Sequence, residues 1–442
     1  MNISHFRTNR DEMLMADAAG TRLPLTVCTR LPLTVCTRLP LTVWILTRTA
    51  LLLCVFKVVT FPGPDVTTDV SVIYQGWYET LSTGTFPPGD VTWQYPPAAA
   101  LAILSPAVVP LLGYASAFFV LAALCDAFVL ALLLHAGVRP GATRRGAWMW
   151  IGGVALLGPT AYARYDLMVT AVAVAALVAG ARRPRMLGVL AGLGAMLKVW
   201  PVLLLLGLPR GRATRRAWAA AAVVATGLTL LFVAAMPGAL GFLTSQRDRG
   251  TEIESLGALV FHGARHIGWD GRVALNYGSV EFLGPWVPLV STLAMVLGVG
   301  ALGWLVLWRL RAREFGPSTV CDAAFAAVLL FTTTSRVISP QYMIWLVGLA
   351  AVCLTLRACR MALPAWLVLA ACAMTVLEFP VYFAHVVESD PLGVLLLAVR
   401  NGLLVAATVT ACVRLWRHTV HEPGSRGSLP LRPAPDKELL SS

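Results

Sequence analysis

The acidic residues that could act as a catalytic base gather in one segment, residues 62–96, directly after the first long apolar run. This segment contains Asp65, Asp69, Glu79 and Asp90 and has no Lys or Arg. A carboxylate at the end of a membrane helix can accept a proton from a substrate hydroxyl, particularly where burial raises its pKa. Asp69 is therefore a candidate general base, and the alternative is a helix cap or a solvated loop acid.

The cation most suggestive of function is Lys198, which interrupts the apolar residues 186–208. A charged residue inside a membrane segment costs roughly 2.5–3.5 kcal/mol on insertion scales and by default indicates function. We expect its partner to be an anion brought by a ligand, such as a phosphate, and the alternative is snorkelling to the interface. Arg164 and Arg336 could complete a pocket for a lipid-linked phosphate whose hydrocarbon tail stays in the bilayer. Alternatively, Arg164 pairs with Asp166 across a short turn.

The remaining polar and aromatic motifs support fewer kinds of chemistry. Trp93 and Tyr95 are typical of side chains at a membrane interface. His262 and His266 have a spacing that suits metal ligands on a helix, but no glutamate lies between them, so we expect no metal site. A Walker A motif, a dinucleotide-binding glycine motif and a hydrolase Gly-x-Ser-x-Gly motif are all missing. The sequence thus predicts no cofactor and gives no support to soluble nucleotide chemistry.

The composition places these residues in a membrane protein. Of the 442 residues 57% are hydrophobic and 13% are charged, and the mean hydropathy is +0.73, a balance that a soluble fold of this length could not bury. The net charge of +13 comes from short cationic clusters between apolar runs, which favours cytoplasmic loops over nucleic-acid binding. Five of the nine cysteines lie inside apolar runs and none falls in a predicted external loop, so we expect no disulfides.

The chain divides into a membrane domain and two polar tails. The octamer TRLPLTVC occupies residues 21–28, recurs at 29–36 and starts again at Thr37, a repeat too short for a solenoid. We predict a disordered cytoplasmic tail over residues 1–40, a membrane domain over 41–416, and a second disordered tail over 417–442.

The apolar runs predict twelve membrane helices. A span needs about 20 apolar residues, and such runs lie near 41–61, 115–136, 145–161, 165–181, 214–236, 286–308, 319–335, 340–356, 362–384 and 392–413. Arginine clusters follow many of them, and the positive-inside rule makes all these clusters cytoplasmic only under two conditions. Residues 97–113 must not cross, and residues 186–208 must enter and return as two short arms that turn near Lys198. The ten runs and these two arms together make the twelve helices. Both termini are then cytoplasmic.

This topology puts the unusual polar clusters on the extracytoplasmic side. The first external loop with an interfacial helix covers residues 62–113, and a large external loop covers residues 237–285. Irregular backbone at the Lys198 turn is tolerated within a membrane only where it lines a cavity.

The motifs as an ordered set resemble a known family. The order is Asp69, Trp77 eight residues later, Asp90 before Tyr95-Pro96-Pro97, Lys198-Val-Trp-Pro201, the segment from Gln246 and Arg247 through Arg249, Glu252 and Glu254, and Ser339-Pro340-Gln341-Tyr342. This set resembles the actinobacterial-type GT-C membrane glycosyltransferases of family 87, which include polyprenol-phosphate-mannose-dependent alpha-mannosyltransferases. The resemblance covers about residues 44–416.

The resemblance implies an all-α polytopic GT-C fold in which the first external loop carries the catalytic acid and juxtamembrane helices. The catalytic Asp of the family maps onto Asp69, because the Trp at +8 aligns with Trp77. The family often has Tyr at +4 and +5, where this chain has Ile73 and Tyr74, so Asp65 stays a reserve candidate.

The implied reaction is inverting transfer of a hexose, mannose for the family, from a polyprenyl-phosphate sugar to a hydroxyl of a cell-envelope glycolipid or glycan. Lys198 with Arg164 or Arg336 would stabilise the leaving phosphate. The other substrate-binding candidates are Tyr74, Trp77, Asp90, Trp93, Tyr95, Arg249, Glu252, Glu254, Gln341 and Tyr342, of which Trp77, Trp93 and Tyr95 suit sugar stacking and Arg249, Glu252 and Glu254 suit a lid.

The resemblance also implies a location, the bacterial plasma membrane. The rival functions are a transporter or flippase for a lipid-linked sugar, a non-catalytic envelope subunit, and a ligase or polymerase that uses lipid-linked donors. A transporter commonly has broken helices in matching halves, whereas the sequence has one broken hairpin, at 186–208. The sequence leaves the oligomeric state open.

Overall fold

The computed structural model describes residues 33–180, 182–244 and 249–420. The greater part of the predicted N-terminal tail, the C-terminal tail from residue 421, and Gln246 and Arg247 of the predicted lid lie outside the described residues.

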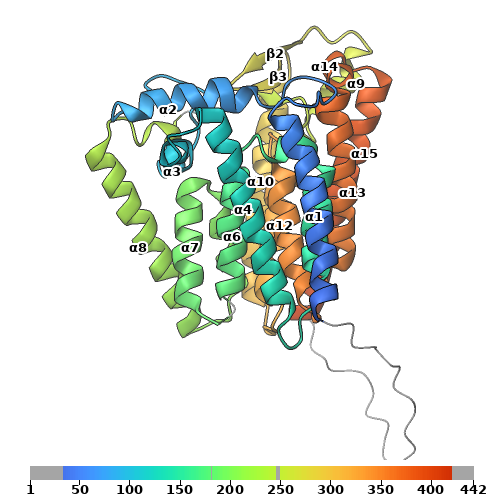
Figure 1. The fold of residues 1–442 in the computed structure, drawn as a ribbon. Coiled ribbons are helices and arrows are strands. Elements are labelled where there is room, and N and C mark those ends of the chain that lie inside the picture. The colour runs from blue at the N-terminus through green and yellow to red at the C-terminus, as the bar shows by residue number, and fades with distance from the viewer. Residues whose placement is uncertain (1–32, 181, 245–248, 421–442) are drawn as a thin grey trace, which may run out of the picture.

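Helices make up most of the described chain. They are α1 Leu33–Val55, α2 Gln75–Ser82, α3 Ala99–Leu104, α4 Tyr114–Gly137, α5 Arg145–Leu156, α6 Asp166–Gly180, α7 Pro184–Leu197, α8 Arg212–Ala235, α9 Ala258–Arg265, α10 Val287–Arg311, α11 Thr319–Thr333, α12 Tyr342–Thr355, α13 Ala362–Val376, α14 Phe383–Glu388 and α15 Pro391–Thr419. The strands are β1 Thr251–Glu252, β2 Arg272–Asn276 and β3 Ser279–Leu283. The long helices stand side by side as a bundle, and α2, α9 and the β2–β3 hairpin lie across one end of it (Figure 1).

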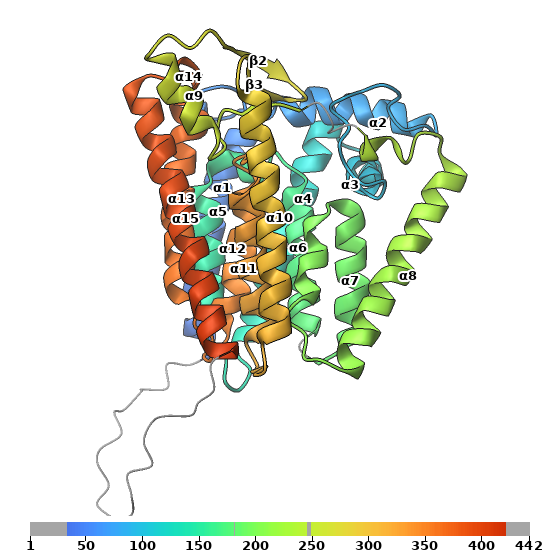
Figure 2. The ribbon, with the colours of Figure 1, turned by 180° about the vertical axis from the view of Figure 1, so that it is seen from behind.

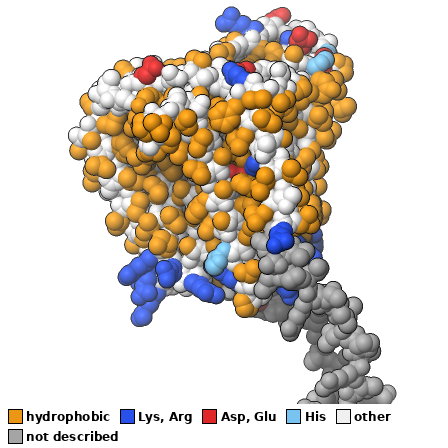
Figure 3. All heavy atoms as spheres, in the orientation of Figure 1, with side chains coloured by type: hydrophobic (Ala, Val, Ile, Leu, Met, Phe, Trp, Pro, Cys, Tyr) orange, Lys and Arg blue, Asp and Glu red, His pale blue; other side chains and the backbone are white. Residues whose placement is uncertain are grey.

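In the described part of the chain, six helices are long and apolar enough to cross a membrane: Arg38–Val55, Tyr114–Gly137, Arg212–Ala235, Val287–Arg311, Ala362–Val381 and Pro391–Thr419. Shorter apolar helices, among them α6, α7, α11 and α12, complete the bundle. Apolar side chains cover most of the face seen in Figure 3, and Lys and Arg side chains gather at its lower end. The protein is a multi-pass membrane protein, since backbone in lipid must form its hydrogen bonds within helices.

Helix α1 begins earlier than the sequence suggested. It starts at Leu33 and runs through Pro40, so residues 33–40, predicted as part of an irregular tail, are helical.

The two segments with special predictions are both short helices. Residues Ala99–Val108 form α3 and a 3₁₀ turn, which at 1.5 Å per residue span about half of a hydrocarbon core. This length agrees with the prediction that residues 97–113 do not cross. Helix α7 ends at Leu197, Lys198 is extended, and a 3₁₀ segment follows over Trp200–Leu205. Pro201 lacks the backbone N–H that would continue the helix, so the break lies where it was predicted.

Small residues let α8 pack on α7 (Figure 2). A Cβ atom at Gly188 would lie 2.1 Å from the carbonyl oxygen of Ala217, and one at Gly192 would lie 2.7 Å from that of Ala221. Two glycines four residues apart on one helix face allow such close backbone contact in membranes.

A small antiparallel sheet, in the order β1-β3-β2, corrects the expectation of an all-α fold. The β2–β3 hairpin turns at Tyr277 and Gly278, which both have positive φ angles, 49° and 73°. Two such residues form the turn that matches the twist of a hairpin. The sheet lies within the predicted large external loop, which is therefore folded onto the bundle as a cap.

A buried polar network joins three helices below the cap. Asp126 of α4 is fully buried and pairs with Arg48 of α1 at 2.9 Å. Its carboxylate also accepts hydrogen bonds from Trp150 Nε1 at 2.6 Å and from the Tyr162 hydroxyl at 2.7 Å. Buried charges persist when paired and fully hydrogen-bonded. This network fixes Tyr162 two residues before Arg164.

Candidate active site

A cavity of about 230 Å³ lies between the bundle and the cap. Nine of the predicted site residues line it: Asp69, Tyr74, Trp77, Tyr95, Lys198, Arg249, Arg336, Gln341 and Tyr342. They come from segments far apart in the chain, and folding brings them together around one cavity.

Asp69 is the first residue of a wide helical turn, Asp69–Tyr74, that continues into α2. Asp65 fixes the approach to this turn, because its carboxylate accepts hydrogen bonds from the Thr67 amide at 2.8 Å and the Thr67 hydroxyl at 2.6 Å. A carboxylate at a helix start is favoured by the helix dipole. Wide turns of this kind are frequent at functional sites.

Arg164 lies behind Asp69 and does not line the cavity. Its Nη2 is 2.9 Å from Asp69 Oδ2, and its Nη1 donates to the carbonyl oxygens of Val66 and Ala163. The structure therefore corrects two expectations, since Arg164 pairs with Asp69 and not with Asp166, and its guanidinium faces a carboxylate and not a ligand phosphate. Among the described residues, no other group binds the Asp69 carboxylate, which leaves Oδ1 to the cavity.

Lys198 reaches the cavity with an anionic partner already in place. Its Nζ is 2.6 Å from Asp166 Oδ1, and its side chain is 12% exposed. The lysine therefore does not snorkel, and its partner within the protein is a carboxylate where we expected only a ligand anion. An ammonium group has three donors, so the bond to Asp166 orients the group and leaves donors for a ligand.

Aromatic rings surround the Lys198 ammonium group. The rings of Tyr95, Tyr165, Tyr342 and Trp345 have centroids 5.3, 5.1, 5.6 and 5.0 Å from Nζ. Trp345 also donates its indole hydrogen to Asp166 Oδ1 at 2.7 Å. Such rings stabilise a cation with their faces, and they give the cavity flat apolar walls of the kind that pack against a sugar ring.

Asp90 and Trp93 support the cavity wall without lining it. Asp90 Oδ2 accepts the indole hydrogen of Trp77 at 2.9 Å, and Trp93 packs edge-on against Trp77 and Tyr95. Burial opposes ionisation of Asp90, but hydrogen bonds from Thr92 and Trp77 outweigh it and leave its pKa below its usual value. Of these residues only Trp77 and Tyr95 can contact a ligand in the cavity.

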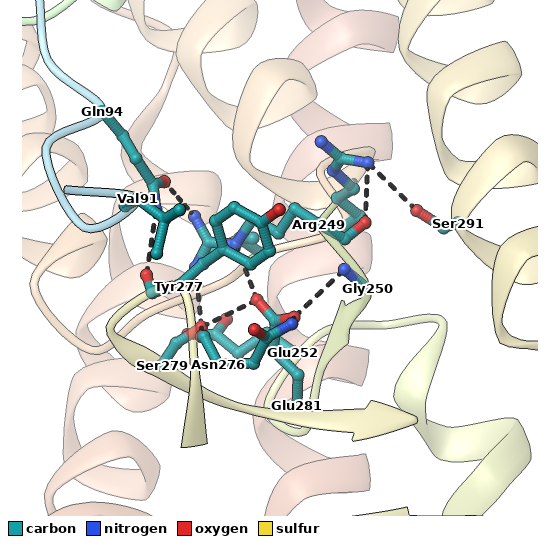
Figure 4. Close-up of polar contacts among 12 residues, drawn as sticks. Val91, Gln94, Arg249, Gly250, Glu252, Asn276, Tyr277, Ser279, Glu281 and Ser291 are labelled. Atoms are coloured by element: carbon teal, nitrogen blue, oxygen red, sulfur yellow. Dashed lines mark hydrogen bonds and ion pairs between the residues drawn. The ribbon is translucent and has the colours of Figure 1, made fainter. Parts of the chain in front are cut away.

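Arg249 fastens the cap over the cavity (Figure 4). Its guanidinium donates to Glu281 at 2.8 Å, to Gln94 at 2.7 Å and to Ser279 at 2.7 Å. Gln94 in turn donates to the carbonyl oxygen of Tyr277 at 2.9 Å. The β2–β3 hairpin is thereby tied to the segment before α3 and forms a fixed roof.

Glu252 and Glu254 correct the lid prediction, because both are buried beneath the cap. Glu252 accepts hydrogen bonds from the Ile338 amide and the Ser339 hydroxyl, both at 2.6 Å. Burial raises its pKa against the opposing effects of Arg249 and these hydrogen bonds. Neither carboxylate lines the cavity, and the hydrogen bonds of Glu252 anchor the cap to the loop before α12.

Arg336 lies where the polar cavity meets an apolar groove. The groove, about 320 Å³, runs between α10 and α11 and is lined by residues such as Met295, Gly298 and Leu302. Phe331, Ser335 and Arg336 line both spaces. Arg336 Nη1 donates to the Arg249 carbonyl oxygen at 2.9 Å. The cation thus marks the junction of a polar site and a hydrocarbon-lined path.

The reserve candidates have structural partners away from the cavity. Asp65 pairs with Lys57 at 2.8 Å and does not line the cavity. His262 hydrogen-bonds Ser389 and the Ile253 carbonyl oxygen, and His266 hydrogen-bonds the Ser389 carbonyl oxygen. These contacts account for both histidines as links between α9 and the α14–α15 turn.

Sequence reasoning missed several residues that build the site. Asp166 and Trp345 orient Lys198, and Glu281 neutralises Arg249. An acid two residues after Arg164 and a tryptophan three residues after Tyr342 were visible in the sequence, but only the fold brings them to Lys198. Glu281 had no sequence signal of its own.

The amino-acid sequence also matches the model of one known protein family. The model of glycosyltransferase family 87 matches residues 93–340, more than half of the chain. The matched span includes Lys198, Arg249 and Arg336 and begins after Asp69. No curated protein and no solved structure matches the chain. A membrane bundle, a cavity walled by aromatic side chains and the extent of this match lead to one conclusion: the chain belongs to glycosyltransferase family 87, the membrane glycosyltransferases of GT-C type.

Proposed function

We propose that the protein transfers a hexose, mannose by family resemblance, from a polyprenyl-phosphate sugar to a hydroxyl of a cell-envelope glycolipid or glycan, with inversion. Membership of family 87 gives the class of reaction. The observation that carries the finer proposal is the continuity of the polar cavity with the apolar groove at Arg336.

Asp69 is the general base. Its carboxylate faces the cavity and is held by Arg164 through one oxygen. The acceptor hydroxyl gives its proton to Asp69 while its oxygen attacks the anomeric carbon. The bond between that carbon and the phosphate oxygen breaks, and polyprenyl phosphate leaves. The phosphate leaves as an anion, so the reaction needs no acid.

Lys198 and Arg336 stabilise the charge that develops on the leaving phosphate. Both line the cavity, where cations in a site of low polarity act more strongly than in water. The charge-assisted bond from Lys198 to Asp166 fixes the ammonium group before the substrate arrives. Trp77, Tyr95 and Tyr342 supply the surfaces for the sugar.

The groove between α10 and α11 takes the isoprenoid tail. Its walls carry Ala294, Gly298 and Ala301 beside larger apolar residues, and a nucleotide sugar has no group that suits them. A hydrocarbon chain in the bilayer can enter such a groove from the side while its phosphate reaches Arg336.

The cavity faces the extracytoplasmic side of the bacterial plasma membrane, with twelve membrane segments and both termini in the cytoplasm. The support is the positive-inside rule applied to the arginine clusters. Three loops lie at the end of the bundle away from the cap, between α6 and α7, between α10 and α11 and between α12 and α13 (Figure 2). They contain Arg182 and Arg183, Arg313, and Arg357.

The proposal is tested by donor choice. Purified protein in lipid nanodiscs receives polyprenyl-phosphate-mannose or a nucleotide-mannose with glycolipid acceptors, and products are identified by mass spectrometry and by NMR of the anomeric centre. We expect transfer from the lipid-linked donor alone, with inversion. Transfer from the nucleotide sugar, or with retention, would contradict the proposal. Movement of the intact lipid-linked sugar across liposomes without transfer would instead identify a flippase.

A further inference from the structure

A buried carboxylate at the other end of the bundle lies in direct contact with no Lys or Arg side chain among the described residues. Asp322 lies in the first turn of α11 and is 6% exposed. No Lys or Arg within the described residues forms an ion pair with it. Buried charges are normally paired or bound to a metal ion, and the side chains that contact this carboxylate include a thiol, that of Cys359.

Two thiols face the same point. Cys353 is fully buried in the last turn of α12, and Cys359 lies in the loop between α12 and α13. The two Sγ atoms and a carboxylate oxygen of Asp322 all lie within 4.8 Å of one another. Cys359 Sγ is 3.4 Å from Asp322 Oδ1. In a tetrahedral zinc site with bonds of about 2.3 Å to sulfur and about 2.0 Å to oxygen, these two ligand atoms are about 3.5 Å apart.

The surroundings also suit a bound metal ion. The Met361 amide donates to Cys359 Sγ at 3.2 Å, a contact that stabilises a thiolate and orients it as a ligand. A cavity of about 240 Å³ reaches Asp322 and has room for a water molecule as fourth ligand. Two thiolates and a carboxylate around a divalent cation leave one net negative charge, and Arg360 and Arg414 line the same cavity.

We propose that Asp322, Cys353 and Cys359 bind a zinc ion that cross-links α11, α12 and the loop after α12. Soft thiolate ligands select zinc over magnesium or calcium. Helix α12 begins at Tyr342 in the active-site cavity and ends at Thr355, about 20 Å away at 1.5 Å per residue. The ion therefore stabilises the fold and takes no part in sugar transfer, so this site stands independently of the proposed reaction.

Metal content and spectroscopy of the full chain test the site. Protein purified without chelator should contain about one zinc ion per chain, and cobalt added to the metal-free protein should give the near-ultraviolet sulfur-to-metal absorption of thiolate ligands. Cys353→Ser and Cys359→Ser should each lower zinc affinity at least about tenfold and remove the cobalt band. Cys372→Ser, which alters another fully buried thiol in α13, should leave both unchanged.

A second measurement uses only wild-type protein, so it does not depend on whether the serine variants fold. In the wild type, zinc should protect Cys353 and Cys359 from alkylation, as measured by mass spectrometry, and should raise the unfolding temperature. The proposal is overturned if wild-type protein takes up no zinc or cobalt, or if the serine variants bind as much as the wild type. Either result would leave the three side chains as a hydrogen-bonded cluster of thiols and an acid.

Discussion

Arg164 holds Asp69 by one carboxylate oxygen, with Nη2 and Oδ2 2.9 Å apart, while two backbone carbonyl oxygens hold the same guanidinium. The buried arginine is thus a fixed support, and the partly exposed acid takes its orientation from it.

Replacing Arg164 by Lys should therefore lower kcat and spare substrate binding. A lysine keeps the charge but has a single nitrogen in place of the planar fork, in which Nη2 holds Asp69 and Nη1 holds both carbonyl groups. A displacement of about 1 Å at a reacting group can cost about 100-fold in rate, and we expect a loss of this size with little change in donor KM. Steady-state kinetics measure it, with Lys57→Arg at the exposed pair with Asp65 as control. An unchanged kcat would show that Arg164 does not position the base.

Asp166→Asn should destabilise the protein, because it leaves the Lys198 charge buried without its anion. Breaking a buried pair from one side costs about 3–5 kcal/mol, and the combined Asp166→Asn, Lys198→Met variant should recover part of this loss. Denaturant unfolding in micelles measures both, and Lys57→Met serves as a control at an exposed lysine. Additive effects of the two changes would mean that the residues are not coupled.

The Trp77–Asp90 bond makes a pH-dependent contribution to stability. The pKa of folded Asp90 lies below its ordinary value of 3.8, so the stabilisation is complete above that value and is lost as the pH falls through the folded pKa. Asp90→Asn should cost about 1 kcal/mol at pH 7, and its difference from the wild type should shrink below pH 3.8. Thermal unfolding across this range checks it. A pH-independent difference for Asp90→Asn would exclude the carboxylate as the cause.

Binding of the isoprenoid tail in the groove can be tested by substituting Gly298 on α10. A Cβ at Gly298 would meet only Thr334 Oγ1, at 3.8 Å, so Gly298→Leu fills the groove without moving the backbone. We expect a higher KM for a long-chain polyprenyl donor and little change for a short-chain one. Gly303→Leu is the matched control, since a Cβ there has no neighbour within 4 Å. Equal effects on both donors would place the tail elsewhere.

The helical membrane bundle and the position of the helix break could be predicted from the sequence. The apolar runs and arginine clusters follow from the requirements of a membrane environment, so they predict the bundle. Lys198 followed by Pro201 predicts the end of α7, because proline cannot continue the helical hydrogen bonds. Asp69 and Trp77, which the sequence motif joined, both line the cavity.

The ion-pair partners could not be predicted. Arg164 and Asp166 are neighbours in the sequence, but Asp69 and Lys198 reach them from distant segments, so the pairing depends on tertiary packing. The small sheet was missed because its strands are short, and the burial of Glu252 was missed because its partners Ile338 and Ser339 lie 86 and 87 residues away.

The most direct measurement is sugar transfer by Asp69→Asn, which removes the base and keeps the shape of the side chain. A general base contributes about 10²–10⁴-fold, so kcat with polyprenyl-phosphate-mannose and a glycolipid acceptor should fall by that factor while donor binding persists. Asp65→Asn, at an acid outside the cavity, should keep most of its activity. Loss of transfer in Asp69→Asn alone is the predicted result, and wild-type turnover by Asp69→Asn would contradict the role of this carboxylate as the base.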